Sequence, residues 1–555
     1  MTPVDIVIVA VFLGFLFFFG SIFFRWIKSP DDYYVAGRML PPFILAATLT
    51  ATNVNLYSFV GQAGKAYEQG ISIIWHTWTG NMALVLAGLF ILPILRRLEI
   101  RTIPEFLEIR YGLGMRVLIA VLWIFRLSFW LGIVLYTGTT AAIVITGTGE
   151  SSYLMWALIF SVVTIIYTTA GGMWSVAFTD VLQFTLMLLG ALIFFPMIMM
   201  QAGGFSGIVR SVPESHFELV PQTGQLNWAF ILAIFFLGIQ WACTDQGMLQ
   251  RAFSGKDVKT VAKGLVLSGI QTTPFALLWY MPGLAARVID SGIKVGDTVI
   301  PFMLSRFLPA GVFGIVICGL LSAQMSTISS NINSTSTLFT SDIFQRVLKK
   351  RASSKLVISV ARIVTLFVGI FMVSFSLLAK KLGAVNAYLT LIGITDMPLF
   401  VIAIVYGIFW KGANWVGAFV GYLSGAITGA FCVFLFFAGS PNASTYATFC
   451  SAGAALIFTP IFSPLFRNNA QMDKAKTIRM ATKPGHKETE RGSGYYIIPV
   501  SRGGRLMLGI FVSGLISFLI SIILGGIGFG KFAAWLSIGS MIVYFAGGLF
   551  RLYFD

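Results

Sequence analysis

The sequence contains about fifteen apolar runs, each close to the 20 residues that a helix needs to cross a bilayer. They lie near residues 4–24, 40–64, 72–95, 117–147, 152–170, 175–200, 226–250, 264–287, 305–345, 356–379, 385–409, 414–438, 444–466, 505–527 and 531–551. Only 11% of the 555 residues are charged, whereas soluble domains carry about 25%. Backbone groups in hydrocarbon must be satisfied within their own segment, so we predict an all-α polytopic membrane protein.

The basic residues, which give a net charge of +17, are concentrated in alternate loops. Short cytoplasmic loops retain Lys and Arg, so this pattern places the amino terminus outside and the carboxyl terminus in the cytoplasm of a cell membrane protein. It also explains the charge without nucleic acid. The basic segment 467–504 is predicted to be a solvated cytoplasmic loop, and a partner or anionic-lipid site there is the alternative. The first apolar run lacks a basic start and a cleavage site, which indicates a retained span.

No pattern of catalytic or metal-binding residues stands out. The cysteines at 243, 318, 432 and 450 all fall in apolar runs, and the three histidines are scattered. No nucleophile–base pair, metal spacing or phosphate loop is visible. We therefore expect neither an enzyme nor a cofactor.

One span is unusually polar. Twelve of the seventeen residues from Leu321 to Thr337 carry a hydroxyl or a side-chain amide. On a helix, Ala323, Ser326, Thr327 and Ser330 share one face. Such a face inside a membrane indicates an ion path, and the alternative is close helix packing with hydroxyls bonded to their own backbone.

Two spans are interrupted by polar residues and glycines, one over residues 46–64 and the other over 238–251. They lie five spans apart, so they cross the membrane in opposite directions. Broken helices at corresponding positions of two inverted halves are typical of the substrate and ion site of a secondary transporter.

Four stretches resemble the sodium:solute symporter family. The segment Tyr167–Gln183, with Gly-Gly followed by Thr-Asp-Val-Leu-Gln, resembles its signature. Residues 31–38, 101–112 and 333–344 resemble its first two cytoplasmic loops and the end of its ion-binding span.

The resemblance implies a leucine-transporter-type inverted repeat of 5+5 helices, with one extra amino-terminal span and several extra carboxyl-terminal spans. Residues 1–39 would form the extra span and its loop, 40–200 the first repeat, 226–409 the second, and 410–555 the carboxyl-terminal spans.

The resemblance also implies two kinds of ion site. The main sodium ligands would come from Ala51, Val54, Ala323, Ser326 and Thr327. A second, more cytoplasmic sodium site would use Asp180, Ser326, Ser329 and Ser330. Asp180 has a plainer alternative as a helix cap near the inner surface.

Substrate in this fold lies beside the two breaks. The candidate lining residues are Asn53, Tyr57, Ser58, Thr77, Trp78, Trp130, Gly238, Trp241 and Asp245. The aromatic ones can stack on a substrate or simply form a hydrophobic gate. Arg126, a cation deep within a span, needs a substrate carboxylate or an acidic partner, with Asp180 and Asp245 as candidates. His76 is either a hydrogen-bond donor or an interfacial aromatic residue.

The prediction that follows is sodium-coupled import of a small polar organic solute by alternating access, with a sugar or sugar-like solute preferred. Its partners are the solute, Na⁺ and the lipid bilayer. An amino acid, carboxylate or vitamin substrate, and coupling to protons, are the alternatives. A membrane sensor that keeps the fold without transport is the other class considered.

Overall fold

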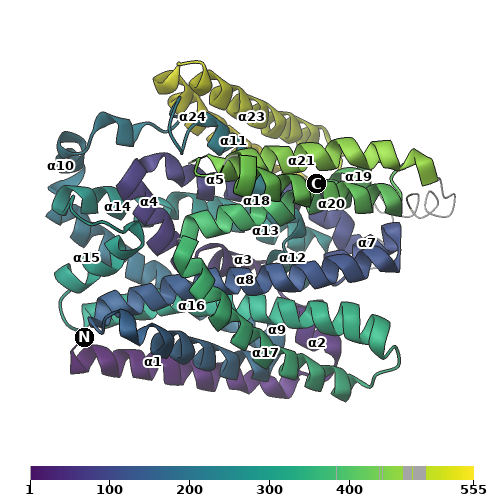
Figure 1. The fold of residues 1–555 in the computed structure, drawn as a ribbon, viewed down its shortest axis with the longest axis horizontal. Helices are drawn as coiled ribbons and strands as arrows, with labels where there is room; N and C mark the ends of the chain where they lie inside the picture. The colour runs from purple at the N-terminus through teal and green to yellow at the C-terminus, as the bar shows by residue number, and fades with distance from the viewer. Residues whose placement is uncertain are drawn as a thin grey trace.

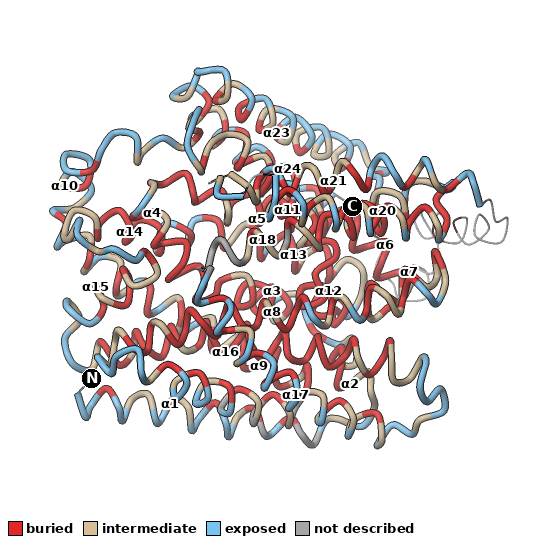
Figure 2. Tube along the Cα trace, in the orientation of Figure 1, coloured by how far each residue is buried: buried red, intermediate tan, exposed pale blue. Residues whose placement is uncertain are grey.

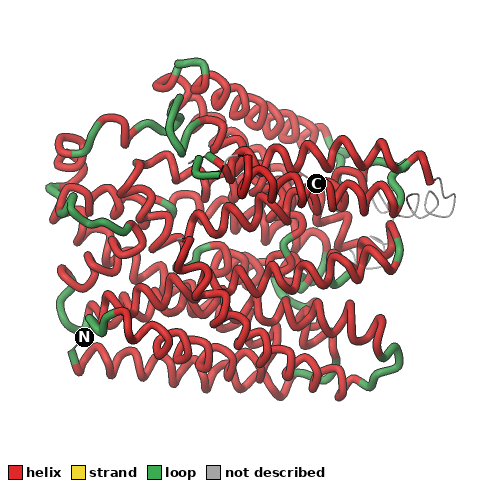
Figure 3. Tube along the Cα trace, viewed as in Figure 1, coloured by secondary structure: helices red, strands yellow, loops and turns green. Residues whose placement is uncertain are grey.

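The computed structural model of the protein describes residues 2–382, 384–436, 438–440, 442–466, 475, 478 and 495–554. This part is helical almost throughout (Figure 3), and its only β-type pairing is an isolated bridge between Leu40 and Gly255. Most of the predicted basic loop 467–504 lies outside the described residues.

The helices follow one another along the chain as labelled in Figure 1. They are α1 (Pro3–Ile22), α2 (Pro30–Val35), α3 (Pro42–Asn53), α4 (Ala63–Gln69), α5 (Trp75–Leu86), α6 (Leu92–Arg97), α7 (Ile103–Tyr111), α8 (Leu113–Thr146), α9 (Tyr153–Gln201), α10 (Gly204–Ser211), α11 (Trp228–Thr244), α12 (Gln246–Phe253), α13 (Val258–Phe275), α14 (Leu277–Ile289), α15 (Val299–Phe307), α16 (Val312–Thr337), α17 (Ser354–Leu382), α18 (Ala384–Phe400), α19 (Tyr406–Phe409), α20 (Trp415–Phe431), α21 (Ala443–Phe462), α23 (Arg502–Gly526) and α24 (Gly530–Phe554). Two π-helical segments, η3 (Ser58–Gln62) and η9 (Leu338–Leu348), continue the chain after the first break and after α16.

Eleven helices of the described chain are long and apolar enough to cross a membrane, and two bent pairs raise the number to thirteen. The predicted runs 152–170 and 175–200 join in α9, where Gly172 has φ 51° and ψ −149° at a kink. The predicted run 385–409 contains a shorter apolar helix, Gly393–Phe409. The all-helical, multi-pass prediction is confirmed.

Both predicted breaks are present, with bends of 51° and 47°. At the first, Val54 leaves the helix with φ −92° and ψ 111°, and the Asn55 side chain accepts from the Ser58 N–H at 3.2 Å. At the second, Asp245 has φ −68° and ψ 123°, and its side chain accepts from the Met248 N–H at 3.2 Å. An Asx side chain therefore caps the outgoing half-helix at each break, where a regular helix would leave N–H groups unpaired.

The polar helix α16 lies at the centre of the bundle. Its residues from Ser322 to Thr337 are all buried, and Figure 2 shows the buried stretches gathered around α3, α8, α12 and α16. The peripheral helices α1, α17 and α23 expose apolar side chains instead, as lipid-facing helices do. Gly319 lets α16 approach α9 closely, because a Cβ there would lie 2.9 Å from the Leu186 carbonyl oxygen.

The amino terminus lies near α15 at the left of Figure 1, and α7 lies at the right. Asp5 holds the start of α1 against the start of α16 by accepting from the N–H groups of Gly311 and Gly314 at 2.8 and 2.9 Å. The segment before α23 packs near the end of α6, where the Arg97 guanidinium donates to the Tyr495 carbonyl at 2.8 Å. Which end faces the cytoplasm stays a prediction.

Candidate functional site

A cavity opens between the two helix breaks. Its lining residues come from both breaks and from α5, α8, α11, α16 and α18: Thr52, Asn53, Asn55, Tyr57, Ser58, Gln62, His76, Thr77, Gly80, Arg126, Trp130, Ile234, Leu237, Gly238, Trp241, Asp245, Thr327, Asn331 and Tyr388. Eight of the nine residues predicted to line a substrate site are among them. The structure thus brings together side chains up to 336 residues apart, from Thr52 to Tyr388, around one cavity.

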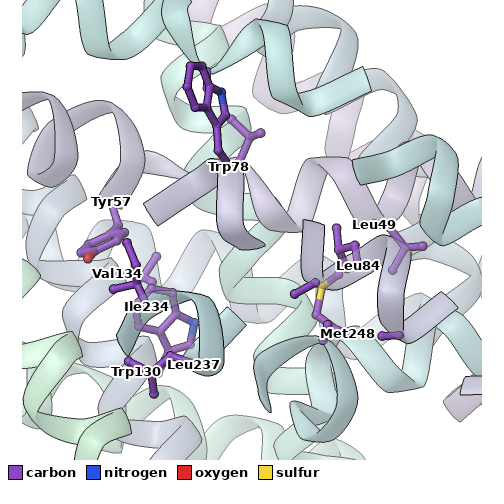
Figure 4. Packing of buried hydrophobic residues seen from close by; sticks show 14 of the residues in the cluster. Leu49, Tyr57, Trp78, Leu84, Trp130, Val134, Ile234, Leu237 and Met248 are labelled. Carbon is purple, nitrogen blue, oxygen red and sulfur yellow. The ribbon is translucent and has the colours of Figure 1, made fainter. Parts of the chain in front are cut away.

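The ninth, Trp78, lies elsewhere. Its indole N–H donates to the Thr273 carbonyl at 3.0 Å, and its ring meets the Trp75 ring edge-on at 5.2 Å. Figure 4 shows Trp78 apart from Tyr57 and Trp130. Successive residues of a helix point about 100° apart, and on α5 it is His76, Thr77 and Gly80 that face the cavity, whereas Trp78 is turned toward α13.

A hydrogen-bond network centred on Gln62 forms part of the cavity wall. The Tyr280 hydroxyl donates to its Oε1 at 2.5 Å, and its amide nitrogen pairs with Nδ1 of His76 at 2.8 Å. The Thr77 and Tyr280 hydroxyls are 2.8 Å apart. The His76 ring pairs with Gln62 and also packs against the rings of Tyr57 and Tyr388, so a hydrogen bond from it to a substrate stays a prediction.

Aromatic rings cover another part of the cavity. The Trp130 and Tyr388 centroids are 4.8 Å apart, and the Tyr57 ring lies 5.7 Å from Trp130 and 5.3 Å from Tyr388. The Tyr57 hydroxyl is buried and has no hydrogen-bond partner among the described residues. A buried hydroxyl is costly to leave unpaired, and Gln62 is the neighbouring polar side chain that interacts with it.

Arg126 is held by two acids. Its guanidinium contacts Asp396 through Nε–Oδ1 at 3.2 Å and NH2–Oδ2 at 2.5 Å, and its NH1 contacts Oδ2 of Asp245 at 2.9 Å. The three side chains are 2%, 0% and 7% exposed. Of the two partners weighed for Arg126, Asp245 is the one that it contacts. The cluster carries a net charge of −1 when both acids are ionised.

The predicted main sodium ligands meet where α16 passes the first break. The Ser326 hydroxyl lies 3.0 Å from the Ala51 carbonyl oxygen and 3.2 Å from that of Ala323. The Thr327 hydroxyl lies 3.3 Å from the Ala323 oxygen. Val54 stands at the non-helical end of α3. Carbonyl and hydroxyl oxygens from two elements are the donors that a hard cation such as Na⁺ requires.

Most hydroxyls of α16 also bond to their own helix. Ser322, Thr335 and Thr337 each donate to the carbonyl four residues earlier, at 2.7, 2.7 and 2.8 Å. The backbone-bonding alternative therefore explains much of the polar composition of this helix. Ser326 differs because its hydroxyl also contacts the Ala51 carbonyl oxygen of the first broken span.

The second predicted sodium set contains a cation already. Oδ2 of Asp180 accepts from Thr48 at 2.5 Å and from the Arg251 guanidinium at 3.1 Å, and Arg251 also contacts the Ser330 hydroxyl. Oδ1 of Asp180 has no partner among the described residues. Ser329 donates to the Ser326 carbonyl at 3.1 Å. Asp180 lies inside α9, so the helix-cap alternative does not apply.

A chain of ion pairs closes the bundle at the α7 end. Arg116 contacts Asp342 at 2.6 Å and Glu108 at 2.7 Å, and Arg346 holds the other side of Glu108. Burial opposes ionisation of Glu108, but its hydrogen bonds from Arg346 and Arg116 outweigh it and lower the pKa of this carboxyl. The network ties η9 to α7 and α8.

Several lining residues, and one acid that contacts the lining residue Arg126, were not identified from the sequence. Asp396 is an acid inside an apolar run, and that property alone marks a buried partner for a membrane arginine. Gln62 and Asn55 lie within the first break and share its polar pattern. Tyr388 carries no such indication, because an aromatic residue in a span is ordinary.

The model of the sodium:solute symporter family matches residues 33–425. A sodium/glucose cotransporter of Vibrio parahaemolyticus is 26% identical over 468 residues, which cover 76% of this chain and 83% of that protein. Sodium/myo-inositol cotransporter 2 of Oryctolagus cuniculus is 28% identical over 475 residues, which cover 77% of this chain and 69% of that protein.

Solved structures show the same fold. A substrate-bound, outward-open Na⁺-coupled sialic acid symporter superimposes with a TM-score of 0.74 at 23% identity, over 83% of this chain and 98% of that one. A nucleobase-cation-symport-1 family transporter in a closed conformation gives a TM-score of 0.50 at 16% identity, over 80% and 99%.

Proposed function

Because the chain belongs to the sodium:solute symporter family, we propose that it couples sodium entry to the symport of a neutral, sugar-like solute. The observation that carries this proposal is the cavity between the two broken spans, where amides, hydroxyls and aromatic rings converge beside the Ser326–Ala51 contact. The relatives are transporters, and we propose no enzymatic activity.

The charge of the cavity supports a neutral solute. Arg126 is the one arginine or lysine of the lining, and both of its sides are occupied by Asp245 and Asp396. A substrate carboxylate would have to displace one of these buried acids from Arg126. We therefore place carboxylates behind neutral solutes. An amino acid would bring its own carboxylate and meets the same obstacle.

The lining suits a polyhydroxylated molecule. The side chains of Asn53, Asn55, Ser58, Gln62 and Asn331 supply both donors and acceptors. Trp130, Tyr57 and Tyr388 supply apolar faces against which a sugar ring can pack. A few convergent polar groups within an aromatic pocket are typical of small-molecule sites.

We propose that Na⁺ binds through Ala51, Val54, Ala323, Ser326 and Thr327. These groups belong to α3 and α16, so the ion would hold the first break against the central helix and shape the cavity, which Thr327 also lines. By linkage, Na⁺ then raises solute affinity by the same factor by which solute raises Na⁺ affinity. Loss of Na⁺ on the cytoplasmic side would loosen this contact and release the solute there.

The position of Arg251 argues against two alternatives, coupling to protons and a second sodium ion. Its guanidinium already neutralises Asp180, the acid that proton coupling would use. A second sodium ion would have to displace this guanidinium or bind at Oδ1 of Asp180. We therefore propose one sodium ion per cycle for this arrangement.

The test is transport by the purified protein in vesicles of defined lipid. A sodium gradient should drive solute-dependent current with a neutral sugar or polyol, and more weakly with sialic acid or an amino acid. A pH gradient without sodium should drive none. Uptake that follows protons, or a preference for carboxylates, contradicts the proposal.

Ser326→Ala tests the ion site, and Ser322→Ala is its matched control. Both serines lie on α16, but the Ser322 hydroxyl donates to the Cys318 carbonyl of its own helix, at 2.7 Å. We expect Ser326→Ala to raise the half-saturating sodium concentration without changing the order of preferred solutes. Equal sodium dependence in the two variants contradicts the assignment.

A further inference from the structure

A second cavity, separate from the solute cavity, lies between α1, α8, α9 and α16. Its volume is about 500 Å³. The wall is built from apolar residues of the four helices and one residue of the first break, and its members include Val9, Leu13, Leu56, Ala141, Ala142, Ile145, Phe160, Leu320 and Met325. None of these residues lines the solute cavity.

The polar groups in this wall are mostly satisfied within the chain. The Thr146 and Thr164 hydroxyls donate to the carbonyls of Ala142 and Phe160 at 2.6 and 2.8 Å. The amide nitrogen of Gln324 donates to the Val134 carbonyl at 2.8 Å, and its oxygen is the atom left without a partner among the described residues. A water would find too few partners here, so the wall favours hydrocarbon.

The cavity opens toward the surface that faces the bilayer. Ile6 and Ile159 on its rim are 56% and 42% exposed, and Ala10 is exposed as well. Leu56 and Gln324 at its inner end are 3% and 1% exposed. Because Asp5 fixes the start of α1 to the loop before α16, the opening is part of the folded structure.

We propose that this cavity binds the acyl chain of a membrane lipid, which enters sideways between α1 and α9. An opening in the lipid-facing surface is continuous with the hydrocarbon of the bilayer. An apolar cavity of this size has a lower free energy when an acyl chain fills it than when it is empty or holds water. The inference is independent of the solute and of its coupling ion.

The inner end of the lipid acyl chain would contact two elements that take part in the proposed transport. Gln324 and Met325 directly precede Ser326 and Thr327 on α16, and Leu56 lies within the first break, two residues after Val54. The lipid chain would thus support the two proposed sodium-binding elements from behind.

The test uses a phosphatidylcholine that carries a diazirine at the end of one acyl chain, in vesicles with the full-length protein. After illumination, mass spectrometry locates the labelled residues. We expect label at Leu56 and Gln324, which bulk lipid on the outer surface does not reach. Ala10→Phe fills the cavity from its exposed rim, and Ala142→Phe fills it from the buried wall. Val11→Phe is the matched control, because Val11 is 67% exposed and lies outside the cavity.

Loss of the inner label in the filled variants, with label retained in Val11→Phe, supports the site. Label restricted to rim residues such as Ile6 and Ile159 overturns it, as does inner label that persists in both filled variants. Ala10→Phe decides the matter if Ala142→Phe does not fold, because the exposed position tolerates a larger side chain.

Discussion

Replacing Arg126 with methionine is expected to destabilise the protein more than any neutralisation of its acidic partners. In the native cluster one guanidinium serves Asp396 and Asp245, and all three side chains are at most 7% exposed. Methionine has a similar length but leaves two carboxylates buried without a counter-ion. Removing one member of a buried pair costs about 3–5 kcal/mol.

The variant Asp396→Asn leaves a different situation. Arg126 keeps its 2.9 Å contact with Asp245, and the asparagine oxygen can still accept one hydrogen bond. The loss is then that of a charge-assisted hydrogen bond, about 1.5–3 kcal/mol. The triple variant with Arg126→Met, Asp245→Asn and Asp396→Asn should recover part of the stability lost in Arg126→Met, because contacting residues do not act additively.

The measurement is the folded fraction of the native protein and of the three variants as a function of denaturant concentration, all in one detergent. A difference of about 3 kcal/mol changes the unfolding equilibrium more than a hundredfold, which this assay resolves. Asp5→Asn, at a site remote from the cavity, controls for the loss of a buried carboxylate. If Arg126→Met is as stable as Asp396→Asn, or if the triple variant is the least stable, the charge argument is refuted.

Three further predictions concern other parts of the chain. Gly238→Leu should weaken solute affinity about tenfold or more while sodium binding persists, because even a Cβ added at this position would lie 3.2 Å from the Thr79 carbonyl oxygen. Solute titration and sodium titration of the purified variant measure the two affinities separately, and an unchanged solute affinity contradicts the cavity assignment. Because the pKa of Glu108 is lowered, its ion pairs stabilise the fold at pH values above the pKa of the unfolded state, and this stabilisation is lost as the pH falls through the lower folded pKa. Glu108→Gln should therefore have a lower free energy of unfolding than the native protein at neutral pH, and the difference should shrink in acid; a difference that is the same at every pH refutes this. The sodium Hill coefficient should be about 1, since Arg251 already pairs with Asp180; a coefficient of about 2 that drops in Asp180→Asn would instead place a second ion there.

The helical spans and both breaks could be predicted because their causes are local. A run of about 20 apolar residues is a membrane helix wherever it lies in the sequence. The breaks arise from polar residues such as Asn55 and Asp245, which cap the next half-helix within three positions. The need of Arg126 for an acid also followed from its place in a span.

The identity of partners could not be predicted, because it depends on how helices rotate and approach one another. Asp396 lies 270 residues from Arg126 and was not among the candidates considered for that arginine, although the candidate Asp245 does contact it. Asp180, the other candidate for Arg126, instead contacts Arg251, which lies 71 residues away along the chain. Trp78 and Thr77 are neighbours in sequence, yet the orientation of α5 sends one toward Thr273 and the other into the cavity.

The sequence by itself therefore determined that this chain is a bundle of membrane helices, with two interruptions and one polar central helix. Hydrophobic length and capping chemistry act over a few residues, so they can be read without the fold. The tertiary structure decided which charges neutralise one another and which side chains share the cavity. Those pairings depend on the packing of segments hundreds of residues apart. Packing alone therefore sets the charge of the cavity wall, on which the proposed kind of solute depends.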